Sequence, residues 1–263
     1  MVEKKKQLKV FHETKVWKKH KIRNPYEVVR FRHLLNFLET GSKEIVLDAG
    51  CGGGTYTNAL AKAMVLIAVD FSSNAIRNAK QKSIPNENIF FIVCDLEQLP
   101  IRDNAIDKVA SIDVLEHIER PQRVVDEISR VLSSHGQMLL FTAVGENRLT
   151  LEFMLKPFLG KIIKSIRSTL GHVSIFTTQG ICSMLSKEFT INHIEYMHHW
   201  VGWLLKIFWD ATHLNSREGH QSPFELSSSV FSRLLWMPLE AEYNIFKDYS
   251  LGTEIILKVT KKQ

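Results

Sequence analysis

The stretch Asp48-Ala49-Gly50-Cys51-Gly52-Gly53-Gly54 decides the fold. It follows an apolar run at residues 44–47 and precedes a segment, 55–62, with a helical pattern. Glycines at 50, 52 and 54 let the chain turn tightly and let a ligand lie against bare backbone. A dinucleotide fingerprint would need glycine where Thr55 or Thr57 stands, and no P-loop lysine follows. The turn therefore predicts a nucleotide-like ligand without a pyrophosphate.

Outward from this turn, short apolar runs alternate with helical patterns. A parallel sheet wound on both faces is the architecture that such alternation favours, with the carboxyl ends of its strands at one edge. Ligands bind at that edge, near the point where the strand order reverses. We predict strands at 44–47, 65–69, 89–93, 105–112 and 137–142, helices at 55–62, 74–82 and 121–132, and a turn at 133–136.

The second half of the chain is less regular. Residues 146–171 and 178–186 have helical patterns, and 190–197 and 253–259 read as strands. Residues 227–246 are broadly helical, although we expect Pro238 to break or kink that helix.

Carboxylates follow two of the predicted strands. Asp70 ends the second strand, 20 residues after Gly50, where a carboxylate can accept hydrogen bonds from ribose hydroxyls. Asp95 follows the third strand and is suited to accept a bond from an exocyclic adenine amine, while Leu96 packs on the ring. Together with the glycine turn, these strand ends describe a nucleoside site.

At this point the sequence resembles the class I S-adenosylmethionine-dependent methyltransferases, close to the type 11 group. The resemblance covers about residues 40–140. It rests on residues 48–54, Asp70, Cys94-Asp95-Leu96, Ser111-Ile112-Asp113-Val114-Leu115-Glu116-His117-Ile118 and Arg130-Val131-Leu132-Ser133-Ser134-His135-Gly136. The last of these departs from the group's usual Arg-Val-Leu-Lys-Pro-Gly-Gly turn. Because this turn has a structural role, we expect the departure to affect function little.

The resemblance implies a Rossmann-like, doubly wound α/β fold with a seven-stranded sheet whose last strand is antiparallel, and helical insertions in the C-terminal half. It implies S-adenosyl-L-methionine as cofactor, with the glycines near its methionine part and Asp113 facing the methionine and the acceptor. The donor-binding residues expected on this basis are Asp48, Gly50, Cys51, Gly52, Gly54, Asp70, Phe71, Asp95, Leu96 and Asp113.

A hydroxyl acceptor needs a base to take its proton, and two histidines are candidates for that role. His117 follows the fourth predicted strand. The alternative to a catalytic role for His117 is that it stabilises the loop. His172 lies in a stretch that resembles the family's approach to its next helix, and its alternatives are capping or packing. Asp113, Glu116 and His117 have a spacing that could bind a divalent cation, but we predict no metal site. His198 and His199 are weaker candidates.

The aromatic segment at residues 200–209 is apolar on nearly all sides. Trp200, Trp203, Leu204, Ile207 and Phe208 form a stripe at helical spacing. Core packing or a homodimer surface is the default interpretation. The alternatives are a lid over an apolar acceptor and insertion at a membrane interface.

The net charge of +6 is concentrated at the N-terminus. Residues 1–23 carry nine basic and two acidic side chains, so the rest of the chain sums to about −1. We interpret this basic arm as a solvated tail, with a clamp for an anionic acceptor, lipid headgroup or nucleic acid as the alternative. Three widely spaced cysteines and the lack of a long apolar run predict a cytoplasmic protein without a transmembrane segment.

The expected organisation is a basic arm at 1–23 and a methyltransferase domain at 24–263, with its core at 40–145 and insertions at about 146–171 and 199–247. The expected function is methyl transfer by in-line displacement to a small-molecule or lipid-like acceptor. A nucleic-acid or protein methyltransferase that uses the arm is the alternative. The Asp113-Val114-Leu115-Glu116 run lacks the proline pair of enzymes that methylate exocyclic base amines. A donor-binding subunit without catalysis is a third reading.

Overall fold

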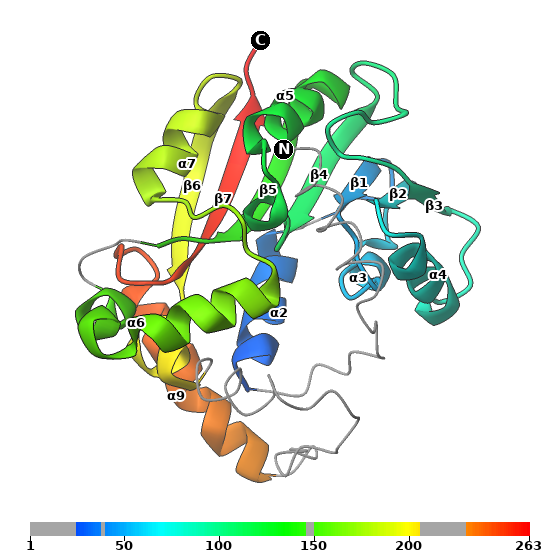
Figure 1. The fold of residues 1–263 in the computed structure, drawn as a ribbon. Helices are drawn as coiled ribbons and strands as arrows, with labels where there is room; N and C mark the ends of the chain where they lie inside the picture. The colour runs from blue at the N-terminus through cyan, green and yellow to red at the C-terminus, as the bar shows by residue number, and fades with distance from the viewer. Residues whose placement is uncertain (1–24, 38–39, 146–149, 206–229) are drawn as a thin grey trace.

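The computed structural model describes residues 25–37, 40–145, 150–205 and 230–263 (Figure 1). The basic arm and the second half of the aromatic segment lie outside the described residues. The strands are β1 Ile45–Ala49, β2 Val65–Asp70, β3 Ile89–Val93, β4 Ile106–Ile112, β5 Leu132–Ala143, β6 Phe189–Met197 and β7 Glu254–Lys261. The helices are α2 Pro25–Phe37, α3 Thr57–Leu60, α4 Ser73–Lys82, the 3-10 turn η1 Leu115–His117, α5 Pro121–Val131, α6 Leu151–Leu170, α7 Thr178–Leu185 and α9 Val230–Phe246.

The seven strands form one sheet in the order β3-β2-β1-β4-β5-β7-β6. Strands β1 to β5 pair in parallel, and β7 pairs antiparallel with both β5 and β6. The predicted doubly wound sheet with an antiparallel last strand is therefore confirmed. The chain winds outward from β1 to β3 and returns to β4 on the other side of β1, so the strand order reverses between β1 and β4.

Helices cover both faces of the sheet (Figure 1). On one face, Ile128 of α5 and Leu185 of α7 pack in a cluster with alternate strand residues such as Leu140. On the other face, Leu34 of α2 and Tyr243 of α9 pack in a cluster with Phe141, the next residue along β5. Successive side chains of a strand point to opposite faces, which is why neighbouring apolar residues serve different clusters.

Helix ends follow local capping rules in several places. The Ser72 hydroxyl accepts from the backbone N–H of Ala75 at the start of α4, and Thr177 caps α7 in the same way. Gly171 ends α6 in the left-handed conformation, with φ 80°. Among the described helices, none has the length and apolar character needed to cross a bilayer.

Three elements differ from the predictions. Helix α3 is shorter than expected, because the glycine turn continues through the residues before Thr57. Helix α9 continues through Pro238, so the expected break is wrong; Leu239 and Tyr243 beyond it are buried against α2. The predicted turn at 133–136 falls within β5, where the pairing with β4 shifts from Ile106–Leu132 to Lys108–Gln137.

Candidate functional site

The glycine turn lies at the carboxyl end of β1 and is fixed by its backbone. Gly50, Gly52 and Gly54 have φ angles of 81°, 51° and 83°, in a region that residues other than glycine rarely adopt. The N–H groups of Gly50 and Cys51 both donate to the carbonyl of Val69 in β2. A Cβ added to Gly50 would come within 2.5 Å of the Val114 side chain, so the turn also abuts the loop after β4.

Asp70 joins the end of β2 to this turn. Its Oδ2 accepts from the N–H of Gly52 at 2.9 Å, and its Oδ1 accepts from the N–H of Ser72 at 2.9 Å. The carboxylate is buried, with 8% of the residue exposed. One carboxylate therefore ties together the glycine turn and the start of α4.

Asp48, in β1, connects the start of the glycine turn to helix α3. It is buried and accepts a 2.7 Å hydrogen bond from the Thr57 hydroxyl of α3. Burial raises the pKa of Asp48 to about 7, against the lowering effect of the Thr57 bond. Burial also raises the pKa of the neighbouring Cys51 thiol, so Cys51 is an uncharged wall of the turn.

The loop after β3 holds Asp95 and Leu96. Asp95 is exposed, and its Oδ1 accepts from the N–H of Glu97 within the loop. Leu96 is buried in the cluster on the α5 and α7 face. Phe71 follows Asp70 and is half-buried. The donor-binding roles of Asp95, Leu96 and Phe71 stay predictions.

Asp113 directly follows β4, has a φ angle of 55° and forms an ion pair with Arg30 of α2. Arg30 Nη1 lies 3.0 Å from Asp113 Oδ2, and 16% of the Arg30 side chain is exposed. The Arg30 guanidinium also sits over the ring of Phe141, 5.4 Å from its centroid. Helix α2 thus reaches over the carboxyl ends of β4 and β5.

His117 and His172 lie together, although 55 positions separate them in the sequence. Their ring centroids are 5.1 Å apart in an edge-on arrangement. His117 Nδ1 lies 3.0 Å from the carbonyl oxygen of Gly171. A carbonyl only accepts, so Nδ1 carries the proton, and in the neutral ring Nε2 has the lone pair.

Glu116 lies beside these histidines. Its carboxylate accepts from the Thr142 hydroxyl at 2.8 Å, and its carbonyl accepts from the N–H groups of Val173 and Ser174. Ligand atoms of Glu116, His117 and His172 lie within 4.8 Å of one another. Two imidazoles and a carboxylate are a donor set that divalent metals accept. By their spacing in the sequence, Asp113, Glu116 and His117 were the possible cation ligands. The structure instead groups His172 with Glu116 and His117.

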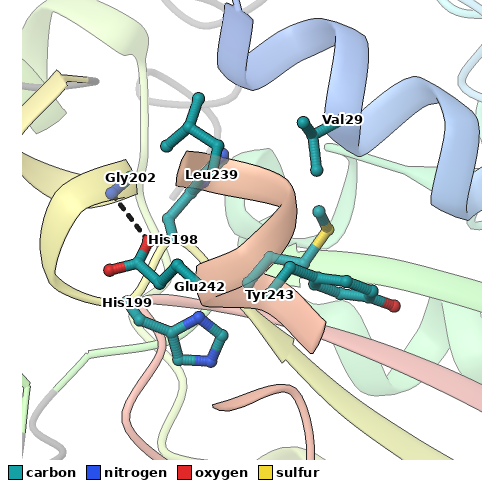
Figure 2. Close-up of a pocket in the computed structure, with 8 residues that line it drawn as sticks. Val29, His198, His199, Gly202, Leu239, Glu242 and Tyr243 are labelled. Atoms are coloured by element: carbon teal, nitrogen blue, oxygen red, sulfur yellow. Dashed lines mark hydrogen bonds between the residues drawn. The ribbon is translucent and has the colours of Figure 1, made fainter. Parts of the chain in front are cut away.

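A separate small pocket lies between α2, α9 and the end of β6 (Figure 2). Its volume is about 10 Å³, close to the room for one water molecule. Its walls include His198, His199 and Glu242, whose carboxylate accepts from the N–H groups of Val201 and Gly202. Burial lowers the pKa of His199 to about 4, which makes it a neutral packing residue. His198 Nδ1 lies 2.7 Å from the buried Glu254 carboxylate.

Sequence reasoning missed two contributors to the site. Arg30 lies on α2, a helix that we did not predict, and its partner is 83 positions away. Thr142 lies on β5, and its hydroxyl meets Glu116 across the sheet edge. A basic residue in a helix and a threonine in a strand carry no local signal of such long-range contacts.

Known proteins resemble this chain in sequence. Residues 47–140 match the family described as "Methyltransferase domain". A ubiquinone biosynthesis O-methyltransferase of Coxiella burnetii is 31% identical over 134 residues, which are 47% of this chain and 57% of that protein. The "Probable tRNA methyltransferase 9B" of Mus musculus is 31% identical over 173 residues, which are 65% of this chain and 33% of that protein. The chain thus spans about one third to just over half the length of the curated relatives it matches.

Solved structures share the fold. The N-methyltransferase NodS from Bradyrhizobium japonicum, in complex with S-adenosyl-L-homocysteine, aligns over 98% of both chains with a TM-score of 0.59 at 15% identity. An S-adenosylmethionine-dependent methyltransferase from Mesorhizobium loti aligns over 88% of this chain and 97% of its own with a TM-score of 0.58 at 15% identity. Residues 47–140 thus match a methyltransferase domain, and the seven-stranded sheet that contains them shares the fold of these solved structures.

Proposed function

We propose that this protein transfers the methyl group of S-adenosyl-L-methionine to a small-molecule or lipid-like acceptor. One observation carries the proposal: the glycine turn, with three glycines at positive φ, is held between the Asp70 carboxylate and Val114. Such a turn accepts a ligand against its backbone at the point where the strand order reverses.

The residues of the turn fit this donor better than a phosphate ligand. Asp48 and Asp70 flank the turn, and residues 44–61 contain neither lysine nor arginine. The Asp70 carboxylate, with no basic residue in this stretch, repels a pyrophosphate, whereas it suits ribose hydroxyls and a sulfonium. When bound, the donor supplies a methyl group already activated on sulfur, and the transfer is an in-line displacement.

We assign the donor contacts as follows. Asp70, at the end of β2, accepts from the ribose hydroxyls. Asp95 holds the adenine amine, Leu96 and Phe71 flank the base, and Asp113 faces the methionine end. Asp48, Cys51 and the three glycines shape the turn itself.

His117 and His172 are the candidates for acceptor activation. The Gly171 carbonyl holds the His117 ring in the tautomer that leaves Nε2 able to take a proton. His172 lies against that ring and is placed to orient it or the acceptor. The remaining rate enhancement comes from positioning the acceptor close to the methyl carbon.

RNA is the alternative to a small-molecule or lipid-like acceptor. The resemblance to an O-methyltransferase of ubiquinone biosynthesis supports a small or lipid-like acceptor. The resemblance to a tRNA methyltransferase, with the basic arm, supports RNA. A mobility shift with RNA that weakens steeply with salt would favour RNA.

We extend the proposal to domain layout and setting. The methyltransferase domain comprises residues 24–263, with acceptor-side insertions at about 146–171 and 199–247. A cytoplasmic setting agrees with the three free cysteines, Cys51, Cys94 and Cys182.

Titration with S-adenosyl-L-homocysteine by calorimetry tests the donor site directly. A lack of binding would refute the proposed function. A labelled-donor screen against cell extract, followed by identification of the labelled product, then determines the acceptor.

A further inference from the structure

Helix α6 presents an apolar stripe to solvent. Met154, Phe158 and Ile162 are spaced four residues apart, so they lie on one side of the helix. Their exposed fractions are 58%, 84% and 48%. The opposite side of the helix contains Ile163, which is buried. A phenylalanine exposed to this degree on a helix that already buries its other side indicates an unused contact surface.

Lysines flank this stripe. Lys161 and Lys164 are exposed and lie along one side of the stripe, whereas Lys156 is one helical turn from Glu152 on the other side of the helix. The only acidic residue of α6 is Glu152, which is paired with Arg167 on the inner side of the helix. The outer side of α6 therefore combines apolar groups with the positive charges of Lys161 and Lys164 and no negative charge from this helix.

A second short helix, residues 200–205, lies beside the start of α6. Trp203 is buried, and its Nε1 donates to Glu152 at 3.1 Å, which fixes this helix beside α6. Trp200 and Leu204, one helical turn apart, are each 50% exposed. We call Met154, Phe158 and Ile162, with the flanking Lys161 and Lys164, the α6 face.

We infer that the α6 face docks on the surface of an anionic lipid bilayer. An interfacial helix places apolar and tryptophan side chains among the acyl chains and lysines against anionic headgroups. A second copy of the chain fits this face poorly. Two α6 faces brought together would oppose two lysines with two lysines and no carboxylate from α6.

The position of the face gives the docking a consequence for the site. Helix α6 follows β5, so it lies beside the carboxyl edge of the sheet, where the glycine turn also lies (Figure 1). A bilayer on the α6 face would bring that edge close to the lipid surface. The docking is a property of the surface alone and does not depend on the proposed methyl transfer.

Co-sedimentation with vesicles tests the inference on the full chain. The probes are vesicles of phosphatidylcholine alone and vesicles with about 30% phosphatidylglycerol. We expect the wild type to bind the anionic vesicles about tenfold more strongly, and Met154→Gln with Phe158→Gln to reduce that binding about tenfold. Lys161→Glu with Lys164→Glu should reduce binding to anionic vesicles only.

Ile84→Gln is the matched control, since Ile84 is 66% exposed in the loop after α4, away from α6. It should bind as the wild type does, and thermal unfolding should show that all variants fold. Wild type that fails to bind anionic vesicles overturns the inference. Unchanged binding of the Met154/Phe158 variant also overturns it and assigns the binding to another part of the chain, such as the basic arm. A dimer in light scattering that this variant dissociates overturns it in favour of self-association.

Discussion

The backbone N–H of Gly52 donates a 2.9 Å hydrogen bond to Oδ2 of Asp70, which ties the glycine turn to the end of the neighbouring strand. The same carboxylate is the proposed ribose acceptor, so one side chain both shapes the turn and binds the donor. Asp70→Ala should weaken the affinity for S-adenosyl-L-homocysteine by at least about a hundredfold, because charged hydrogen bonds contribute roughly 1.5–3 kcal/mol each. Calorimetry measures this, with the exposed Asp126→Ala on α5 as control. Unchanged affinity in Asp70→Ala would refute the ribose assignment.

Two glycine substitutions should have opposite effects on stability. Gly50→Ala should lower the free energy of unfolding by about 2 kcal/mol or more, because its φ is 81° and its Cβ would clash with Val114. Gly160→Ala should raise it by roughly 0.5–1 kcal/mol, because Gly160 lies within α6 and an added Cβ meets no atom closer than 3.7 Å. Urea unfolding of both variants measures the difference. Equal effects would show that backbone conformation does not control the turn.

His117→Gln and His172→Ala should lower turnover while leaving donor affinity nearly unchanged. A general base contributes about 10²–10⁴-fold to rate, so His117→Gln should fall within that range. His135→Asn is the control, since His135 is an exposed histidine at positive φ, a conformation that asparagine tolerates. Turnover at the wild-type level in either variant removes that histidine from the site.

The basic arm should be separable from donor binding. Deleting residues 1–20 removes seven basic and two acidic side chains, and so +5 of the net charge of +6, but no residue of the proposed donor site. We expect the affinity for S-adenosyl-L-homocysteine to stay within about twofold, since charges without direct contact are screened beyond about 10 Å at 0.1 M salt. A tenfold loss in calorimetry would instead show that the arm covers the donor.

Stability should decrease at acidic pH because of His199. Burial holds its pKa at about 4, whereas an unfolded histidine has a pKa of about 6.5. Below pH 6.5 the unfolded chain takes up a proton that the folded chain does not, so stability falls as pH falls toward 4. Between pH 7 and pH 5 this contributes a loss of about 2 kcal/mol. Urea unfolding of His199→Gln should show a correspondingly smaller loss, and an equal loss would assign the effect to other groups.

Local patterns predicted most of the central fold. Each of the five strands before the insertions lies within a few residues of its expected range, because apolar runs bounded by glycine and aspartate are local signals. The glycine turn and Asp70 were likewise predicted from neighbouring residues. The short α3 and the continuous α9 were not, because their lengths depend on tertiary packing, as with Leu239 against α2.

The site was predicted only where its residues follow strands. His117 and His172 were each identified from their surroundings, but nothing local indicates that their rings meet at 5.1 Å. The Arg30–Asp113 pair depends on where α2 crosses the sheet, and that is determined by the packing of Leu34 and Tyr243 rather than by the sequence around Arg30.

The insertion of β7 between β5 and β6 has a consequence for synthesis of the protein. During translation, β5 and β6 emerge from the ribosome before the strand that must separate them. Until residues 254–261 emerge, each of these two strands has an unsatisfied edge exposed to other nascent chains. This half of the sheet therefore closes late, when β7 pairs with β5 and β6 and fills the gap between them.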